Sequence, residues 1–409
     1  MPSLQVFRRA YMPGYGSDYG PWRYRLFPEH ELRAQILKRC TTNISSDRGS
    51  LSASFQPHVS SANEDRSLIM DLSLPNGIWS LTCVFDGHGG HETADYLVAE
   101  LPSLLTAGLS STMANLEGVS DALTRAIYDI DEAIKRDFLE IFPEEIDEIA
   151  TMSDTTVKAR VNDQCSGGLN HRKALRCMRG STILLALVDP TKTHLWVVNL
   201  GDGVAVLGSR RDANSQWNAS ILSDNHNGNN PAEADRIRQQ HPDEPECIFD
   251  DRVFGNLAVT RAVGDHAFKL SRIYTDKIFL NVEPGFRVPA AIKSFIPRNM
   301  SPPYVSNLAS VRYVDLHAQS SCDYFILMCS DGLVDLYTDD PDRAEPLTSL
   351  VQKWVEIVGD VVRDDIQEAM LGLLRHALGA EDVDSVSRML TVDMPVAYMD
   401  DTTIVLQVL

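Results

Sequence analysis

The chain has 409 residues, 44% of them hydrophobic and 23% charged, a composition typical of a folded protein with a large core. Its formal net charge is −20 at pH 7, which argues against nucleic acid as a partner, because a phosphate backbone needs a basic surface. No apolar stretch approaches the roughly 20 residues that a helix needs to cross a bilayer, so we expect no membrane span.

Residues 1–50 are rich in aromatic residues, glycine and proline, and we interpret them as an N-terminal extension that wraps onto a core or forms an arm. The segment contains several arginines but also several acids, whereas a mitochondrial transit peptide is rich in Arg and poor in acids. Seven scattered cysteines without a C-x-x-C pair predict neither a disulfide framework nor a zinc site. We therefore expect an intracellular protein and leave cytoplasm, nucleus and mitochondrion open.

Short apolar runs bounded by Gly, Asp or Asn predict β-strands in the rest of the chain. These runs cover residues 78–85, 182–188, 194–199, 204–207, 324–329 and 403–408. The runs 194–199 and 204–207 are joined by Leu-Gly-Asp-Gly, which favours a hairpin.

Apolar residues at helical spacing predict helices between the strands. These helices cover residues 92–105, 119–138, 231–240 and 347–378, the last range as one or two helices. Two polar stretches, 151–178 and 285–309, lack periodicity and are predicted as loops. Because the strands cluster instead of alternating strictly with helices, we predict an α+β fold with antiparallel sheets and one catalytic domain over residues 51–409.

Acidic residues recur at the ends of the predicted strands. They are Glu64 and Asp65 before a strand, Asp86 after 78–85, Asp202 in the turn after 194–199, Asp331 after 324–329, and Asp400 and Asp401 before the last strand. Any one of them could be a cap or a turn former. Several carboxylates at one shared edge, however, would repel one another unless cations neutralise them. Ligands that are all oxygen favour Mg²⁺ or Mn²⁺ over zinc or copper, and the Gly87 carbonyl is a further oxygen ligand of this kind.

Seven segments carry a resemblance to a known family. They are NED at 63–65, FDGHGG at 85–90, GST at 180–182, NLGDG at 199–203, LAVTRAVGD at 257–265, CSDGLVDL at 329–336 and DDTTIVL at 400–406. In content and order they resemble the metal-dependent (PPM, type 2C) protein serine/threonine phosphatases, over roughly residues 60–409.

The resemblance implies an α-β-β-α sandwich with two Mg²⁺ or Mn²⁺ ions between two antiparallel sheets. The implied ligands are Asp86 bridging both ions, Asp331 and Asp400 completing the first, the Gly87 carbonyl on the second, and Glu64 and Asp65 acting through water; Asp202, Asp331 and Asp335 match a third, weaker site. It also implies a monomeric enzyme that acts on phosphorylated proteins.

The implied mechanism is attack on phosphorus by a hydroxide that bridges the two ions, with Asp86 and His88 as the catalytic residues. His88 is the candidate general acid for the departing Ser or Thr oxygen, because imidazole titrates near neutral pH. His88 and His91 also form H-x-x-H, but neither helical i, i+4 spacing nor a third ligand accompanies this pair, so we do not favour zinc. We assign His226 no catalytic role and Arg261 a structural one.

Two positions depart from the family pattern. Many members have a phosphate-binding arginine where this chain has Ser60, so the substrate-binding residues stay unassigned. Asp401 stands where asparagine is usual, and it could either tighten metal binding or accept hydrogen bonds. The pyruvate dehydrogenase phosphatase branch also lacks that arginine, and Lys269 in LAVTRAVGDHAFK resembles that branch too. One alternative hypothesis is therefore a mitochondrial enzyme of that branch. The other, suggested by Ser60, is a pseudophosphatase that binds phosphoproteins without hydrolysing them.

Overall fold

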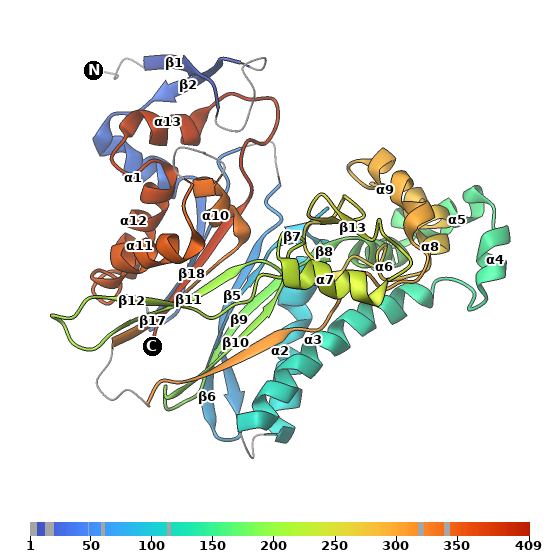
Figure 1. Ribbon diagram of the computed structural model, residues 1–409, viewed down its shortest axis with the longest axis horizontal. Coiled ribbons are helices and arrows are strands. Elements are labelled where there is room, and N and C mark those ends of the chain that lie inside the picture. The colour runs from blue at the N-terminus through green and yellow to red at the C-terminus, as the bar shows by residue number, and fades with distance from the viewer. Residues whose placement is uncertain are drawn as a thin grey trace.

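The computed structural model describes residues 6–12, 20–47, 49–58, 62–112, 116–317, 323–338 and 344–409. Two antiparallel sheets pack face to face at its centre, and helices cover both outer faces (Figure 1). This arrangement confirms the predicted α+β class with two sheets between helices.

Each sheet is antiparallel throughout. The five-stranded sheet has the order β16 (Ser310–Asp315), β10 (His194–Leu200), β9 (Ile183–Val188), β6 (Gly77–Phe85) and β5 (Arg66–Leu74). The six-stranded sheet has the order β12 (Asn218–Ile221), β11 (Val204–Arg210), β17 (Asp323–Cys329), β18 (Thr402–Val408), β4 (Ser50–Phe55) and β3 (Cys40–Ile44). The last strand of the chain, β18, is therefore an internal strand.

Smaller strand pairs and the helices complete the fold. The small sheets pair β1 (Val6–Ala10) with β2 (Trp22–Leu26), β13 (Ile248–Phe249) with β14 (Arg252–Val253), and β7 (Gly87–His88) with β8 (Gly180–Ser181) and β15 (Val263–Gly264). The α-helices are α1 (Glu29–Leu37), α2 (Glu92–Thr112), α3 (Leu116–Leu139), α4 (Ile146–Thr151), α5 (Asp154–Val161), α6 (Leu169–Met178), α7 (Pro231–Gln240), α8 (Arg272–Lys277), α9 (Pro289–Phe295), α10 (Asp331–Thr338), α11 (Leu347–Gly359), α12 (Ile366–Leu378) and α13 (Val383–Thr391). Three 3₁₀ turns are η1 (Gln164–Ser166), η2 (Phe279–Asn281) and η3 (Ile296–Arg298). Among the described residues, no helix combines the length and the apolar character that a membrane crossing requires.

The alternation of side chains between the two faces of a strand explains why the central strands contain continuous apolar runs. In β17, Phe325 and Leu327 pack against the helices, whereas Ile326 and Met328 point into the space between the two sheets. Side chains of a strand alternate between its two faces, so a strand covered on both faces needs a continuous apolar run. The sandwich thus has three apolar layers: one between the sheets, one under α2 and α3, and one under α11 and α12.

The hairpin predicted for residues 194–207 is wrong. β10 pairs with β9 and β16 in one sheet, whereas β11 pairs with β12 and β17 in the other. The turn between them crosses from sheet to sheet, and Gly201 adopts φ +119° there, a conformation that favours glycine. Both strands are apolar on both faces, so the sequence pattern does not reveal which sheet each strand joins.

The two polar stretches are not loops as predicted. Residues 151–178 contain α5 and α6, and residues 285–309 contain α9 and η3. These helices are short, and α6 is mostly polar apart from a stripe that includes Ala174, Leu175 and Met178. Contact with α3 and α2 stabilises α6, which local periodicity does not reveal. Together with α4, α7 and α8 they form a lobe beside the sandwich (Figure 1).

The described part of the N-terminal segment packs on the C-terminal helices. The Asp393 backbone N–H donates to the Arg23 carbonyl at 2.7 Å, and the Phe27 backbone N–H donates to Ser387 Oγ at 3.0 Å. Leu32 and Ile36 of α1 are buried in the same core as α11 and α12. Strand β3 extends the six-stranded sheet at its edge.

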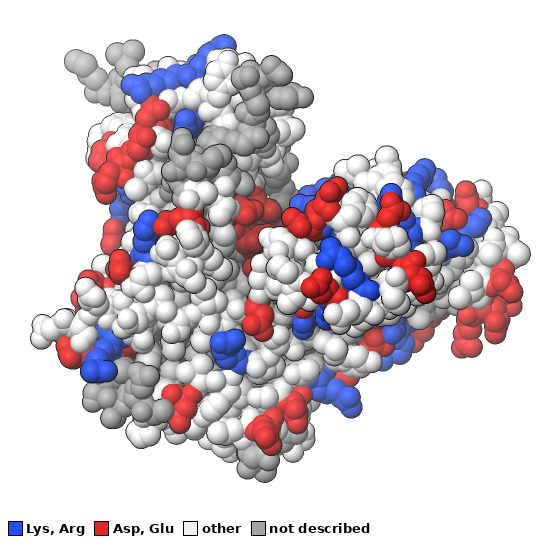
Figure 2. Space-filling view, in the orientation of Figure 1, with Lys and Arg blue, Asp and Glu red and all other residues white. Residues whose placement is uncertain are grey.

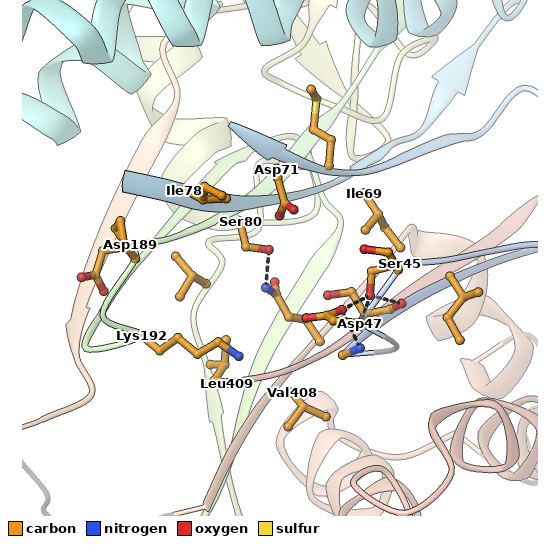
Figure 3. Close-up of a pocket in the computed structure, with 18 residues that line it drawn as sticks. Ser45, Asp47, Ile69, Asp71, Ile78, Ser80, Asp189, Lys192, Val408 and Leu409 are labelled. Carbon is orange, nitrogen blue, oxygen red and sulfur yellow. Dashed lines mark hydrogen bonds between the residues drawn. The ribbon is translucent and has the colours of Figure 1, made fainter. Parts of the chain in front are cut away.

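A cavity of about 410 Å³ opens near the first residues of β6 and the last residues of β18 (Figure 3). Gln407 lies beside it and joins the two sheets, because its amide donates to Ser80 Oγ at 2.9 Å and its carbonyl accepts from Thr82 Oγ1 at 3.1 Å. The acids that follow β6 and precede β18 lie at the opposite end of these strands, so this cavity is separate from them.

Candidate metal centre

Strand ends bring the predicted acids together at one edge of the sandwich. In the first sheet Arg66, the first residue of β5, pairs with Phe85, the last residue of β6, so Asp65 and Asp86 are neighbours. In the second sheet Cys329 at the end of β17 pairs with Ile404 near the start of β18. Because neighbouring strands are antiparallel, the end of one lies beside the start of the next, and acids far apart in sequence meet.

Five carboxylates form two groups at this edge. Oxygen atoms of Asp86, Asp202 and Asp331 lie within 4.8 Å of one another, and so do oxygen atoms of Asp331, Asp335 and Asp400. Asp331 belongs to both groups, because it is the first residue of α10 and Asp335 follows one turn later on the same face. These clustered carboxylate oxygens are ligands of the kind that a divalent cation requires.

The carboxyl groups strongly favour protonation when no cation is present. Burial raises the pKa of Asp86 well above its ordinary value, and the nearby Asp65, Asp331 and Asp202 raise it further. Burial also raises the pKa of Asp331, with added repulsion from Asp202, Asp335 and Asp400. The pKa of Asp65 is raised to about 8, chiefly by burial. Such crowding is costly unless positive charge enters the site.

Two buried carboxylate oxygens lack a partner among the described residues: Asp202 Oδ1 and Asp331 Oδ1. Buried polar atoms are nearly always satisfied, so these two oxygens point to a ligand that supplies positive charge. Oxygen-only donors fit Mg²⁺ or Mn²⁺, and the residues present therefore fit a divalent metal centre. Acidic side chains are visible in the hollow between α10 and the lobe (Figure 2).

Neighbouring groups hold several of the acids in place. Ser330 Oγ donates to Asp65 Oδ2 at 2.8 Å, Asn227 Nδ2 donates to Asp202 Oδ2 at 2.7 Å, and the Asp401 backbone N–H donates to Asp400 Oδ1 at 2.8 Å. Such contacts orient each carboxylate before any ion binds.

Asp401 accepts hydrogen bonds and is in neither group of clustered acids. Its Oδ2 accepts the Glu64 backbone N–H at 2.5 Å, and its Oδ1 accepts Gln56 Nε2 at 2.6 Å. Both oxygens are used, so Asp401 fixes the segment that carries Glu64. The sequence left open whether Asp401 tightens metal binding or accepts hydrogen bonds, and the structure fits the second role.

His88 forms a close pair with Asp265. His88 Nε2 lies 2.6 Å from Asp265 Oδ2. Burial lowers the pKa of His88, but Asp265 and nearby acids outweigh this effect and raise the pKa above its usual value. A Cβ at Gly180 would lie 2.0 Å from His88 Nε2, so only glycine leaves room for this pair.

The H-x-x-H pair does not converge on a common point. His91 Nδ1 lies 2.7 Å from Asp95 Oδ2, whereas His88 faces Asp265. Neither histidine belongs to a group of potential metal ligands within the described residues.

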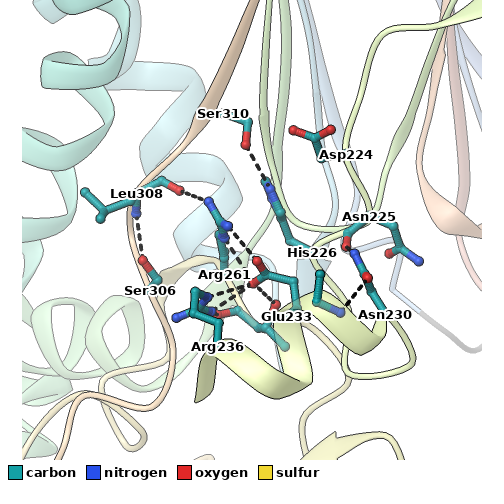
Figure 4. Close-up of polar contacts among 12 residues, drawn as sticks. Asp224, Asn225, His226, Asn230, Glu233, Arg236, Arg261, Ser306, Leu308 and Ser310 are labelled. Carbon is teal, nitrogen blue, oxygen red and sulfur yellow. Dashed lines mark hydrogen bonds and ion pairs between the residues drawn. The ribbon is translucent and has the colours of Figure 1, made fainter. Parts of the chain in front are cut away.

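Arg261 has structural contacts, as predicted, and His226 is held by hydrogen bonds (Figure 4). Arg261 donates to both carboxylate oxygens of Glu233 and to the Leu308 carbonyl. His226 Nδ1 accepts the Gly201 backbone N–H at 3.2 Å, and its Nε2 lies 3.1 Å from Ser310 Oγ.

Lys269 is buried against Asp131. Its ammonium group donates to both carboxylate oxygens of Asp131 and to the Ala262 carbonyl. The Gly264 backbone N–H donates to the same carboxylate at 2.8 Å. Asp131, which belongs to α3, therefore anchors the segment that leads to Asp265.

The structure brings most of the predicted ligands together but leaves some unassigned. Glu64 and Asp65 lie beside the two groups without belonging to them, and Gly87 follows Asp86 in β7. Ser60 lies outside the described residues.

Arg287 is a residue that the sequence analysis missed: its guanidinium forms an ion pair with Glu64. It lies in a stretch predicted as a loop, more than 200 positions away, and no local signal marks it.

An array of carboxylates between two antiparallel sheets, with a histidine–aspartate pair beside it, defines a divalent-metal hydrolase. Comparisons with known proteins agree. The family model described as protein phosphatase 2C matches residues 49–384. The chain therefore belongs to the protein phosphatase 2C family, and its activity is that of a metal-dependent protein serine/threonine phosphatase.

The chain is similar to several known proteins. The chain is 27% identical to the human mitochondrial pyruvate dehydrogenase phosphatase 2 over 418 residues, covering 86% of this chain and 76% of that protein. It is 26% identical to a protein phosphatase 2C homolog of Schizosaccharomyces pombe, covering 83% and 76%. It is 31% identical to the human mitochondrial pyruvate dehydrogenase phosphatase 1, covering 62% and 52%. A sex-determining protein of C. elegans has a similar fold, with a TM-score of 0.50 and 18% identity over 87% of this chain and 64% of that one.

Proposed function

We propose that the chain hydrolyses phosphoserine and phosphothreonine esters in proteins at the two groups of carboxylates, with two Mg²⁺ or Mn²⁺ ions. The observation that carries this proposal is that Asp331, which follows a strand of one sheet, lies with Asp86 of the other sheet in one group and with Asp400 in the second group. Asp86 would contact both ions, Asp331 and Asp400 would bind the first, the Gly87 carbonyl would bind the second, and Glu64 and Asp65 would act through water. Asp202, Asp331 and Asp335 would hold a third, weaker ion.

The protein contributes orientation and charge to the reaction. When bound, the divalent ions supply an activated water as nucleophile and neutralise the phosphoryl oxygens. The rigid strand ends hold the carboxylates at fixed separations, so little reorganisation accompanies the reaction. The hydrogen bonds from Ser330 and Asn227 prevent the acids from rotating away.

His88 would protonate the departing Ser or Thr oxygen. Asp265 fixes the ring through Nε2 and favours the charged imidazolium, so a proton is available at neutral pH. The ring nitrogen that Asp265 does not engage, Nδ1, is the proposed donor.

The test of the proposed function is metal-dependent release of phosphate from a phosphothreonine peptide and from p-nitrophenyl phosphate. We expect turnover with Mn²⁺ or Mg²⁺, none in EDTA, and recovery when the ion is restored. Turnover that is unchanged in EDTA would rule out the proposed centre. A pseudophosphatase would bind the peptide without turnover and would bind Mn²⁺ weakly or not at all in calorimetry.

A second candidate concerns the substrate. The similarity to two human mitochondrial pyruvate dehydrogenase phosphatases supports phosphorylated pyruvate dehydrogenase as substrate and the mitochondrion as location. Comparison of kcat/KM for phosphorylated pyruvate dehydrogenase with that for an unrelated phosphoprotein tests the first point. Cell fractionation tests the second, and recovery of the chain only in cytosol or nucleus would count against it.

We also propose that residues 51–409 form the catalytic domain, that residues 1–50 are an extension docked on it, and that the enzyme is a monomer. The contacts of Arg23 with Asp393, and of Phe27 with Ser387 of α13, support the docking. Sedimentation of the full chain and of a 51–409 fragment tests both points, since a docked extension predicts a folded but less stable fragment.

A further inference from the structure

Arg287 forms an ion pair with Glu64, a proposed ligand of the metal centre. It comes just before α9, and its Nη2 donates to Glu64 Oε1. The Arg287 side chain is 67% exposed, whereas that of Glu64 is only 11% exposed. The guanidinium therefore covers the carboxylate on its solvent side.

Arg287 acts on acids of both sheets. Burial raises the pKa of Glu64, which precedes β5, and Arg287 opposes that rise. Desolvation likewise raises the pKa of Asp400, which precedes β18, and Arg287 opposes this rise too. The direct contact of Arg287 is with Glu64, and its positive charge also acts on Asp400.

The segment that carries Arg287 is held by apolar contacts on both sides. Phe286 packs against the main core, and Phe295 at the end of α9 is fully buried. The ring of Phe295 stacks on Phe268 with centroids 4.7 Å apart and on Phe254 at 5.3 Å. Arg287 is thus presented from a fixed support, as a ligand-binding side chain requires.

One contact with Glu64 leaves most of the guanidinium available. Arginine has five N–H donors in a planar fork that matches two oxygens of a phosphoryl group. In the described residues, the contact with Glu64 is the one hydrogen bond recorded for this side chain. The Arg287 side chain is 67% exposed, so its remaining donors are accessible to a phosphorylated side chain that comes from solvent.

We propose that Arg287 binds the phosphoryl group of the substrate at the mouth of the metal centre. This inference rests on the proposed phosphatase function. It assigns a substrate-binding residue to the segment 285–298 of the neighbouring lobe.

The test compares wild type with Arg287→Ala, Arg287→Lys and the control Lys293→Ala, all in the full chain with Mn²⁺. Lys293 is an exposed basic residue on α9, so its loss changes the net charge by the same amount. We measure kcat and KM for a phosphothreonine peptide and for p-nitrophenyl phosphate, the inhibition constant of inorganic phosphate, and Mn²⁺ affinity by calorimetry. Thermal unfolding verifies that each variant folds.

For Arg287→Ala we expect KM and the inhibition constant of phosphate to rise about 10- to 100-fold, the range of a lost charge-assisted hydrogen bond. Arg287→Lys should restore part of this loss, because lysine keeps the charge but not the fork. Mn²⁺ affinity should stay unchanged or become tighter, since a positive charge next to the acids is removed. Lys293→Ala should stay within about 2-fold of wild type, because an exposed charge is screened.

Two results would overturn the inference. An unchanged inhibition constant of phosphate in Arg287→Ala would mean that Arg287 does not contact the phosphoryl group. Weaker Mn²⁺ binding with an unchanged phosphate constant would mean that Arg287 only positions Glu64. If wild type has no metal-dependent turnover, the proposed function fails instead, and calorimetric binding of inorganic phosphate to the Mn²⁺-loaded wild type and Arg287→Ala then tests Arg287 separately.

Discussion

The substitution Asp331→Asn tests two effects of the acid groups: their destabilisation of the metal-free protein and their binding of metal. Asp331 belongs to both groups, so this nearly isosteric change removes one negative charge from each. It should weaken metal binding and at the same time stabilise the metal-free protein, because it relieves repulsion. These opposite signs are specific to a cation site.

The magnitude follows from the separations. The grouped oxygens lie within 4.8 Å of one another, and two unit charges at that limit repel by about 3.5 kcal/mol at an effective dielectric constant of 20. The raised pKa of Asp331 means that protonation already relieves part of this repulsion in the metal-free protein. We therefore expect Asp331→Asn to stabilise the metal-free protein by about 1–3 kcal/mol and to weaken Mn²⁺ binding by about 100-fold or more, the loss of a direct carboxylate ligand.

The assay is thermal or urea unfolding in EDTA and in Mn²⁺, with calorimetry for the affinity. In EDTA the variant should unfold at a higher temperature than wild type, and in Mn²⁺ wild type should gain more stability than the variant. Asp364→Asn, at an exposed acid away from the site, is the control for loss of one negative charge. A less stable variant in EDTA, or unchanged Mn²⁺ affinity, would refute the reasoning.

Three further outcomes are expected. Asp265→Asn should lower the pKa of His88 and shift the alkaline limb of the pH–rate profile to lower pH, and it should cut kcat about 10- to 100-fold for a phosphothreonine peptide. Turnover of p-nitrophenyl phosphate should fall much less, because its leaving group needs no proton. An equal loss on both substrates would contradict a general-acid role. Burial lowers the pKa of His226 from 6.5 to about 4, so between these pH values the unfolded chain takes up a proton that the folded chain does not. Urea unfolding should therefore show the free energy of unfolding falling by about 3 kcal/mol as the pH drops from 6.5 to about 4. His226→Gln should flatten this pH dependence, and an equally steep profile would exclude His226 as its source. A chain ending at Val396 lacks β18, whose Ile404, Val405 and Leu406 are fully buried, and should not fold cooperatively by circular dichroism; a cooperative, active truncation would refute the internal role of that strand.

Much of the site was predictable from the sequence because strand ends are local features. The run before Asp86 and the run before Asp331 each end in a residue that must leave the sheet, and such acids stand out against apolar neighbours. The helix predicted over residues 231–240 likewise has a local start signal, because Pro231 is its first residue and the Asn230 side chain accepts the backbone N–H of Ala232. These signals depend on a few consecutive residues.

Other features depended on contacts between distant segments. Neither Arg287 nor the two hydrogen bonds of Asp401 had a local signal, because their partners Glu64 and Gln56 lie hundreds of positions away. Helices α5, α6 and α9 were missed since their short or polar sequences are stabilised mainly by the surfaces they cover.

The sequence alone determined six of the central strands, the long helices and the carboxylates that follow or precede the strands, since alternation and strand-end chemistry are encoded within a few residues of each other. Only the tertiary structure decided that β10 and β11 join different sheets, that Asp331 is common to both acid groups, and that Arg287 covers Glu64. The physical reason is that a strand buried on both faces is compatible with either sheet. The packing of complete sheets and helices, a cooperative property of the whole chain, selects among these pairings.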